Sequence, residues 1–285
     1  MAQSASRYRC QPGWLSHEVG AAVSDVYPLV AAEPLADSLA PYAEVQRARP
    51  DGGCWVMANM VGGLDGSAAI GGRVAGLSTP PDQAMFTAMR SLADVVLVGA
   101  QTVRREGYGS LRLPPDRAAA RRAAGQAEVP RLAVVSRSLD LDWSGRAFAG
   151  AAPGRRPIVL TGAGADPERL ARARAVAEVI VAGPDQVEPG QVAAELSGLG
   201  CRVVLCEGGP TLLGQFAAAG RLDELCLTIA PLMGGDPLPV AVAPPAAPLR
   251  HFSLRHVLRA GDTLFLRYER DSDAPAEMRA GAAAR

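Results

Sequence analysis

Residues 206–213 read CEGGPTLL, and this stretch decides the fold. It follows the apolar run 201–205 and precedes an apolar pattern with helical spacing, so it predicts a strand, a tight turn and a helix start. Its two adjacent glycines let a ligand approach the main chain closely, and the free N–H groups of a first helical turn favour an anion. A phosphate cradle and an ordinary strand-to-helix turn both fit this stretch taken alone.

Two other strand ends carry groups that suit an anion. The apolar run 94–98 is followed by Gly99 and Thr102, and the run 132–135 is followed by Ser136 and Arg137. A helix N-cap explains the first pair and an exposed turn explains the second, if each is taken alone. Ligands of open α/β sheets bind at the carboxyl ends of strands, so the three places together suit a pyrophosphate and one further phosphate, as in NADP.

Residues 59–66, which read NMVGGLDG, leave a predicted strand and enter a glycine-rich loop. The loop leaves room for a flat ligand, and its carboxylate, Asp65, is a candidate proton donor or ligand anchor. An Asp-Gly turn is the alternative interpretation. Residues 162–164 read GAG after another strand, but the spacing of a dinucleotide fingerprint is missing, so we interpret them as a loop before a helix capped by Asp166.

Strands and helices alternate along most of the chain, which predicts an α/β fold with a mostly parallel sheet. A strand pair near the end adds an antiparallel edge and makes the sheet mixed. The predicted strands are 55–61, 94–98, 132–135, 157–161, 179–182, 203–206, 225–229, 252–258 and 263–268, and the predicted helices are 82–92, 167–177, 192–199 and 211–219. Residues 117–127 are predicted to form a polar helix or a loop.

Composition excludes several function classes. The formal net charge is zero, so binding of nucleic acid through bulk electrostatics is not expected. All 29 basic residues are Arg, which excludes a Schiff-base lysine and leaves phosphate binding to Arg, hydroxyl and backbone N–H groups. The five Cys follow no zinc-ligand spacing, so no metal site is predicted.

The chain is predicted to have one main domain, 51–270. Residues 1–50, which Pro28, Pro34, Pro41 and Pro50 interrupt, are expected to form an N-terminal arm that packs on the domain or on a second subunit, with a disordered tail as the alternative. Residues 271–285 are expected to be a disordered tail. We find neither a signal peptide nor a membrane-spanning apolar run, so no membrane partner and a cytoplasmic location are expected.

The order of these motifs resembles the reductase domain of the bacterial riboflavin pathway, a pyrimidine reductase family with the dihydrofolate reductase fold, and most closely its stand-alone actinobacterial type. The resemblance covers residues 54–268 and rests on NMVGGLDG (59–66), ADVVLVGAQTV (93–103), EGGPTL (207–212), and LDELCLTIAP (222–231) followed by two glycines. It implies a dihydrofolate reductase-like three-layer fold with a mixed, mostly parallel central sheet.

The resemblance also implies an NADPH-dependent reductase, a homodimer, and residues for each role. Hydride transfer to C1′ of 5-amino-6-(5-phosphoribosylamino)uracil, or of a close relative, is the expected reaction, with Asp65 or a water that it orients supplying the proton. The cofactor is expected at Val61, Gly99, Thr102, Ser136, Arg137, Thr161, Gly208, Gly209, Pro210, Thr211 and Leu212. The substrate is expected at Asn59, Asp65, Arg90, Leu111, Arg112 and Glu207.

Three departures from the family pattern surround the expected substrate pocket. Gly63 and Ser67 stand where a serine and a basic residue are common, Gly76 stands where an aromatic residue is common, and EGYG (106–109) replaces an Asp-Asp/Asn-Pro loop. The sequence therefore specifies the identity of the small-molecule substrate less closely than that of the cofactor. A pterin or dihydrofolate reductase with Asp65 protonating the pterin, and a non-catalytic NADPH-binding protein, are the alternatives.

Overall fold

The structure, a computed structural model, describes residues 34–149 and 154–271. Most of the predicted arm over 1–50 and all but the first residue of the predicted tail over 271–285 lie outside these ranges. The chain divides into two units, 1–37 and 38–285. Only 34–37 of the first unit are described, and they form neither helix nor strand. All that follows concerns the second unit.

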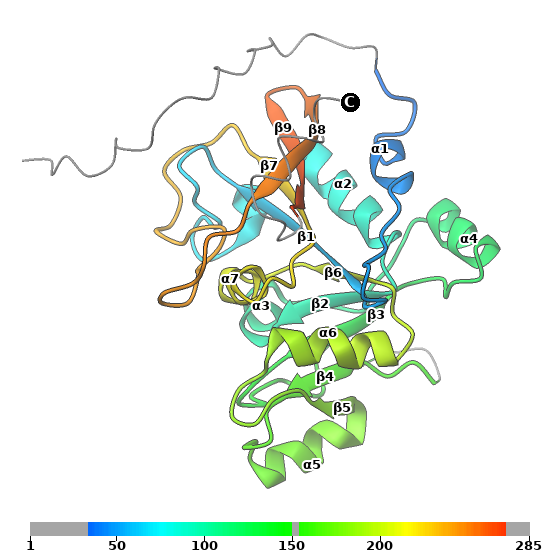
Figure 1. The fold of residues 1–285 in the computed structure, drawn as a ribbon, viewed down its shortest axis with the longest axis vertical. Helices are drawn as coiled ribbons and strands as arrows, with labels where there is room; N and C mark the ends of the chain where they lie inside the picture. Colours follow the sequence, from blue (N-terminus) through cyan, green and yellow to red (C-terminus); the bar gives the residue numbers. More distant parts are fainter. Residues whose placement is uncertain (1–33, 150–153, 272–285) are drawn as a thin grey trace, which may run out of the picture. The chain divides into compact units, whose positions relative to one another are not determined.

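Helices and strands alternate through this unit, as the hydrophobic pattern predicts (Figure 1). The strands are β1 (Trp55–Gly62), β2 (Val95–Gly99), β3 (Arg131–Val135), β4 (Ile158–Thr161), β5 (Glu178–Val181), β6 (Val203–Cys206), β7 (Glu224–Ile229), β8 (Phe252–Ala260) and β9 (Thr263–Arg270). The helices are α1 (Ala40–Ala43), α2 (Pro80–Arg90), α3 (Ala100–Glu106), α4 (Pro115–Ala123), α5 (Pro167–Val176), α6 (Pro189–Gly198) and α7 (Pro210–Ala218), with a 3-10 turn, η1, at Val74–Gly76.

The strands form one sheet in the order β5-β4-β3-β2-β6-β1-β7-β9-β8. Neighbours from β5 to β7 are parallel, and β9 runs antiparallel to both β7 and β8. From β1 to β5 the strands are added toward the β5 edge of the sheet, and the connections between them contain α2, α3 and α5. From β5 to β7 the strands are added in the opposite direction, and the connections contain α6 and α7. Right-handed crossovers therefore place these two groups of helices on opposite faces of the sheet. The predicted α/β fold with a mixed, mostly parallel sheet is confirmed.

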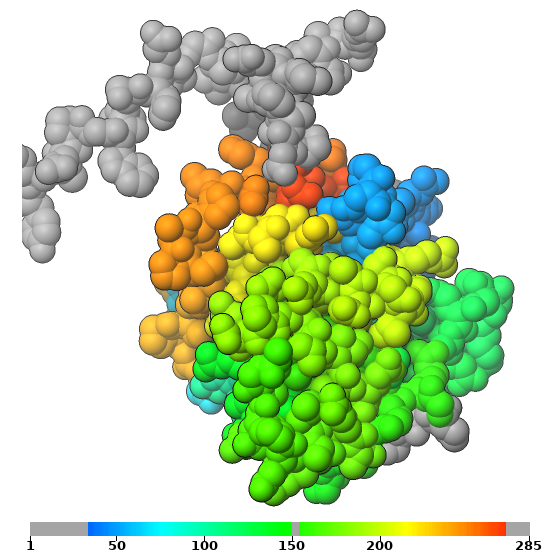
Figure 2. Space-filling view, turned by 60° about the horizontal axis from the view of Figure 1, so that its bottom comes forward, coloured from blue at the N-terminus to red at the C-terminus, as the bar shows by residue number. Residues whose placement is uncertain are grey.

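Two apolar cores, one on each face of the sheet, bear out this layering. On one face Met57 of β1 packs with Met85 and Met89 of α2. On the other face Val56 of β1 belongs to the core that includes Leu196 of α6 and Phe216 of α7. In Figure 2 the yellow-green and yellow atoms, from the part of the sequence that holds α6 and α7, lie on the face turned toward the reader. Successive residues of β1 thus point to opposite faces and both are buried, which is why this strand reads as a nearly continuous apolar run.

The part of the predicted arm that the structure describes in this unit packs on the sheet. Leu39 and Tyr42, around α1, are each 1% exposed and belong to the same core as Met57. Arg47 follows them and pairs with Glu224 of β7. In this part of the chain, residues 38–49 therefore belong structurally with the domain.

The described residues contain no helix that is long and apolar enough to cross a membrane. They also contain no group of three or more His, Cys, Asp or Glu side chains that could hold a metal ion.

Candidate active site

The strand order places a crevice at the carboxyl end of β6. Helix α3, which follows β2, and helix α7, which follows β6, leave for opposite faces although the two strands are neighbours. Ligands of open α/β sheets bind at such a switch point. The turns after β2 and β6 meet there, since the Gly99 amide donates to the Gly208 carbonyl oxygen over 2.8 Å.

These two turns form the candidate anion cradle expected from the sequence. Gly99 and Gly209 are the N-caps of α3 and α7, and neither end carries a side-chain cap or an acidic residue in its first turn. A Cβ atom added to Gly209 would lie 2.9 Å from the Thr102 hydroxyl oxygen, so the close approach depends on glycine. The Gly208–Gly209 peptide is cis, and Gly208 has a φ of 84°, which glycine tolerates best.

The first turn of α7 contains the other three cofactor residues expected from the sequence. Thr211 is exposed, Pro210 is half-buried and Leu212 is buried against the core under α6 and α7. Pro210 has no N–H, so the amides of Thr211 and Leu212 are the donors that this turn contributes.

The neighbouring strands β3 and β4 bring Ser136, Arg137 and Thr161 to the same edge of the sheet. The Ser136 hydroxyl oxygen accepts from the Leu139 amide over 3.1 Å. The Thr161 hydroxyl is buried without a hydrogen-bond partner, and the exposed Arg137 side chain makes no hydrogen bond or ion pair with the described residues. A buried hydroxyl without a partner and a free guanidinium therefore remain for a ligand.

Strand β1 lies on the other side of β6 and positions Asn59 and Val61. Ala58 is level with Cys206 in the register of β1 and β6, so Asn59 lies beside Glu207. Asn59 is 7% exposed, and its side-chain amide makes no hydrogen bond with the described residues. Val61 packs with Leu77 and Ala230 in a small apolar cluster at the end of the strand.

Glu207 carries the strongest interactions of the site. Arg90, at the end of α2, grips it with two parallel hydrogen bonds, Nε to Oε1 over 2.7 Å and Nη2 to Oε2 over 2.8 Å. The Tyr108 hydroxyl donates to the same Oε2. The Arg90 guanidinium also lies 4.3 Å from the ring centre of Phe86 and 5.7 Å from that of Tyr108. Arg90 is therefore held in one orientation.

Burial and the Glu207 carboxylate hold this cluster in defined protonation states. Burial is the larger cause and the nearby charge of Glu207 is the second, and together they raise the pKa of Tyr108 well above its usual value. Burial lowers the pKa of Arg90, but its hydrogen bonds and charge contact with Glu207 outweigh burial and raise it. Tyr108 is therefore a neutral donor and Arg90 a permanent cation at any physiological pH.

Asp65 lies in the exposed loop after β1, and it fastens that loop to the loop after β7. Its Oδ1 accepts from the Ser67 hydroxyl over 2.6 Å and from the Ser67 amide over 3.1 Å, and its Oδ2 accepts from the Gly234 amide over 2.7 Å. The Ser67 hydroxyl, the Gly234 amide and the Ser67 amide lower the pKa of Asp65 well below its usual value. These contacts favour an ionised loop anchor and do not support the proton-donor role expected from the sequence.

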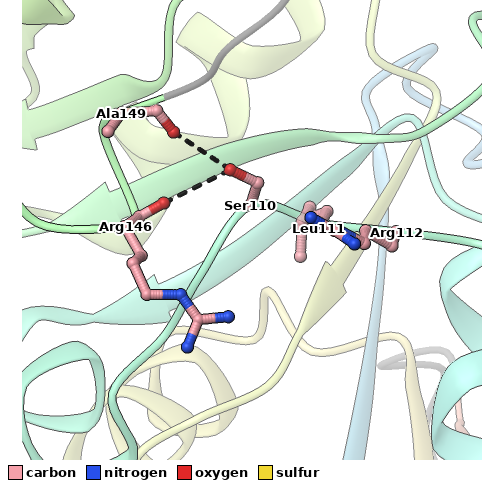
Figure 3. Close-up of a pocket in the computed structure, with 5 residues that line it drawn as sticks. All are labelled: Ser110, Leu111, Arg112, Arg146 and Ala149. Carbon is pink, nitrogen blue, oxygen red and sulfur yellow. Dashed lines mark hydrogen bonds between the residues drawn. The ribbon is translucent and has the colours of Figure 1, made fainter.

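Leu111 and Arg112 line a pocket of about 480 Å³, together with Ser110, Arg146 and Ala149 (Figure 3). Leu111 is half-buried against the core, whereas Arg112 is exposed. The Ser110 hydroxyl lies between the carbonyl oxygens of Arg146 and Ala149, at 3.3 and 3.0 Å.

The structure thus brings most of the sequence-predicted residues to one edge of the sheet. Asp65 lies in a loop beyond it, and Leu111 and Arg112 line the pocket with Ser110 and Arg146. Sequence analysis missed two residues, Tyr108 and Arg146. Tyr108 lies in the EGYG segment, where a departure from the family pattern marked the substrate side, so an aromatic residue at that place was the available signal. Arg146 follows an irregular loop and carries no such signal.

The residues present fit a dinucleotide phosphate group. The cradle at Gly209 would be filled by a Cβ atom, the first turn of α7 offers free amides, and the Thr161 hydroxyl has no partner among the described residues. β1, β6, β2, β3 and β4 are consecutive in the sheet, and strands lie about 4.8 Å apart. An extended dinucleotide can follow such a row.

Comparison with known proteins agrees with this arrangement. The chain is 28% identical over 181 residues to the 2,5-diamino-6-ribosylamino-4(3H)-pyrimidinone 5′-phosphate reductase of Methanothermobacter thermautotrophicus, covering 64% of this chain and 79% of that protein. A pyrimidine reductase-like protein from Corynebacterium diphtheriae superposes with a TM-score of 0.71 at 27% identity, covering 84% of this chain and 96% of that one.

The riboflavin biosynthesis reductase of Saccharomyces cerevisiae shares the fold, with a TM-score of 0.55 at 17% identity, and the match covers 77% of this chain and 90% of that one. The family model described as the RibD C-terminal domain matches residues 54–266, which include all of the strands from β1 to β8 and the first half of β9. The chain belongs to the RibD C-terminal domain family.

Proposed function

We propose that this protein is an NADPH-dependent reductase that reduces 5-amino-6-(5-phosphoribosylamino)uracil, or a close relative, by hydride transfer to C1′ of the ribosyl group. The observation that carries the proposal is the meeting of the turns at Gly99 and Gly208 beside the Arg90–Glu207 pair. A phosphate cradle and a charged, oriented substrate contact are thereby adjacent. The pyrimidine reductase relative supports this substrate class.

In this proposal the chain binds and orients the two reactants. The amides of the α7 start and the Thr102 hydroxyl hold the cofactor phosphates, and Ser136, Arg137 and Thr161 hold its adenosine end. Val61 lies against the nicotinamide, which when bound supplies the hydride. Asn59 and Arg90, which Glu207 and Tyr108 hold in place, fix the substrate close to the donor carbon.

Reduction of the ribosylamino compound and reduction of a pterin both have Asp65 as a candidate proton source, and the contacts of this carboxylate do not support direct proton donation in either reaction. A group with a pKa well below its usual range holds no proton to give near neutral pH. We therefore assign Asp65 to holding the loop after β1 against the loop after β7. A cytoplasmic location and a homodimer belong to the proposal as expectations from the family resemblance.

The test is to follow the absorbance of NADPH with purified protein and, in separate reactions, the phosphoribosylaminouracil and dihydrofolate. We expect NADPH to be consumed only with the ribosylamino compound. Consumption of NADPH with dihydrofolate alone would show that the protein is a pterin reductase. Tight NADPH binding without turnover of either compound would leave the non-catalytic alternative.

A further inference from the structure

The loop after β1 and the loop after β7 are joined by two carboxylates that act in opposite directions. Asp65 of the first loop accepts from the Gly234 amide of the second over 2.7 Å. Asp236 of the second loop accepts from two consecutive amides of the first, that of Gly71 over 3.0 Å and that of Gly72 over 2.6 Å. We call these reciprocal contacts the clasp. Hydrogen bonds to a charged acceptor are stronger than neutral ones, so the clasp holds the loop after β1 near both of its ends.

The backbone of the first loop forms a site for the Asp236 carboxylate. Gly71 and Gly72 have left-handed backbone angles, with φ of 57° and 78°, which glycine adopts most readily. Successive amides in a turn can form a concave site for an anion. Both side-chain contacts of Asp236 cross between the loops, whereas Asp65 also accepts from Ser67 within its own loop. Substitution of Asp236 therefore tests the contact between the loops alone.

Backbone hydrogen bonds join the two loops between the carboxylates. The Ala68 amide donates to the Leu238 carbonyl oxygen over 2.7 Å, and the Asp236 amide donates to the Ala69 carbonyl oxygen over 2.8 Å. The two loops therefore lie side by side (Figure 1). They form one structural unit, which we call the clasped loops.

The clasped loops enclose the end of β1. On one face of this strand, Val61 packs with Leu77, which follows the first loop, and with Ala230, which begins the second. On the other face, a methyl carbon of Val240 lies 2.7 Å from the place that a Cβ atom of Gly62 would take. Successive residues of a strand point to opposite faces, so the clasped loops contact the end of β1 from both sides.

The clasped loops are also tied to the two helices that begin at the candidate anion cradle. The Val242 amide donates to the Pro210 carbonyl oxygen, in the first turn of α7, over 3.0 Å. A Cβ atom at Gly214 would lie 1.9 Å from the Val242 carbonyl oxygen, so the second loop rests on the backbone of α7. Glu106, at the end of α3, accepts from the Val74 amide just beyond the first loop over 3.1 Å.

We propose that Asp236 is a positioning residue for hydride transfer. It holds the clasped loops around the end of β1, so that a nicotinamide lying against Val61 keeps one place relative to the substrate. The inference rests on the proposed function, which puts the nicotinamide against Val61. Asp236 touches neither reactant and acts through the loop after β1. A misplacement of about 1 Å can cost roughly 100-fold in rate, so loss of such a contact has a measurable effect on kcat.

Hydrogen exchange of the protein without ligand, followed by mass spectrometry of peptides from residues 63–73, tests the clasp itself. Asp236→Ala is expected to speed exchange of the Gly71 and Gly72 amides about tenfold or more, because both lose their acceptor. Asp236→Asn keeps one acceptor oxygen and gives a smaller increase. This milder variant keeps the proposal testable if Asp236→Ala does not fold.

Asp262→Ala is the matched control for charge. Asp262 is exposed between β8 and β9, and its side chain makes no hydrogen bond or ion pair with residues 34–149 and 154–271. The control removes the same charge and leaves exchange of the loop unchanged. Unchanged exchange in both Asp236 variants would overturn the proposal, as would an equal increase in Asp262→Ala.

Kinetics test the consequence for the reaction. With NADPH and the phosphoribosylaminouracil, Asp236→Ala is expected to lower kcat about tenfold or more. Its NADPH affinity, measured by calorimetry, stays within about twofold of the parent, because the proposed phosphate contacts are unchanged. Asp236→Asn recovers part of the loss, and Asp262→Ala has the kcat of the parent.

The positioning role and the proposed function fail in different ways. A parent that consumes NADPH and an Asp236→Ala protein with the same kcat would overturn the positioning role while the reductase stands. A loss of NADPH affinity as large as the loss of kcat would also overturn it, because the clasped loops would then hold the whole cofactor and not the place of its nicotinamide. A parent that consumes no NADPH would reject the proposed function and the positioning role with it.

Discussion

At the scale of single residues, the cradle depends on the absence of a side chain at Gly209. The backbone of Gly209 has ordinary extended angles, so alanine is sterically allowed by the main chain, but its Cβ atom would lie 2.9 Å from the Thr102 hydroxyl oxygen. We expect Gly209→Ala to weaken NADPH binding at least about tenfold, which is about 1.4 kcal/mol, because the methyl group displaces the Thr102 hydroxyl that is proposed to hold a cofactor phosphate. Quenching of protein fluorescence by NADPH measures the affinity.

Gly198→Ala is the control for this substitution. Gly198 ends α6, and a Cβ atom there would meet nothing within 4 Å. Alanine in a helix is expected to leave NADPH affinity unchanged and to stabilise the fold slightly, by up to about 1 kcal/mol. A Gly209→Ala protein that binds NADPH as the control does would show that the cofactor phosphates lie elsewhere.

Asp65 gives a prediction about pH. Its folded-state pKa lies below its unfolded value, so its contribution to stability is present above the unfolded pKa of about 3.9 and is lost as pH falls toward the folded pKa. Asp65→Asn is therefore expected to be less stable than the parent by a constant amount between pH 5 and pH 8, roughly the range above that pKa, with the difference shrinking below about pH 4.

Urea unfolding at several pH values measures this difference. The pH profile of kcat in Asp65→Asn separates the two roles of the carboxylate. A loop anchor leaves the shape of the profile unchanged, whereas a proton donor removes one limb of it. Loss of a limb would restore Asp65 as the proton donor and contradict its assignment as an anchor.

At the scale of elements, one buried arginine of α4 ties this helix to the segment between α2 and β2. Arg121 is 3% exposed, and its guanidinium donates to the carbonyl oxygens of Ser91 and Ala93 over 2.8 and 2.7 Å and to that of Ala127 over 2.8 Å. Arg121→Ala leaves these three acceptors unpaired and should cost about 2–4 kcal/mol of unfolding free energy.

Chemical denaturation measures the cost, with Arg122→Ala as the control. Arg122 is on the same helix but its side chain is 54% exposed, where it pairs with Glu128, so its loss should cost less than about 1 kcal/mol. Similar losses for the two variants would contradict the anchoring role of Arg121. Because α4 carries no site residue, NADPH affinity should not change in either variant.

Most elements could be predicted from the sequence because strands such as 94–98 and 203–206 are continuous apolar runs with glycines at their ends. For the helix over Pro115–Ala123 the sequence does not decide between helix and loop. Its residues are mostly Ala and Arg, and its buried residue, Arg121, has a side chain that the sequence pattern would place in solvent. The glycine turns of the site could also be predicted, because a tight turn depends on the backbone conformation of its own few residues, which glycine allows.

Contacts between distant positions could not be predicted in this way. Tyr108 meets Glu207 across 99 positions, and the Ser110 hydroxyl reaches the Arg146 carbonyl across 36. Neither pairing follows from the periodicity of apolar residues, because each depends on how an irregular loop packs against the rest of the fold. The contact of Asp65 with Gly234 could not be predicted either, because the two residues are 169 positions apart, and that contact helps to lower the pKa of Asp65.

At the scale of the whole unit, Glu224 joins segments from both ends of the described chain. It is 0% exposed and accepts hydrogen bonds from Arg47, from Trp55 of β1 and from Arg267 of β9, at 2.8–3.0 Å. Burial raises its pKa, but the hydrogen bonds and charges of Arg47 and Arg267 outweigh burial and lower it. The cluster lies at the amino end of β7, away from the site.

Glu224→Gln leaves the buried Arg47 guanidinium without its carboxylate partner and leaves Arg267 with Glu269 alone, and we expect it to cost about 3–5 kcal/mol of unfolding free energy. Glu178→Gln is the control, since the Glu178 side chain is 43% exposed and its pair with Arg131 should contribute less than about 1 kcal/mol. Equal unfolding free energies for the parent and Glu224→Gln would show that the cluster does not hold these segments together.

The central claim is that the carboxyl end of β6 joins a nicotinamide donor to the ribosyl carbon of a pyrimidine. The most direct measurement is mass spectrometry of the product after incubation with the phosphoribosylaminouracil and NADPH that carries deuterium at the transferable position. The account predicts a ribitylamino product with one deuterium at C1′, and a much lower rate in Gly209→Ala. No product, or a reduced product without deuterium at C1′, would contradict it.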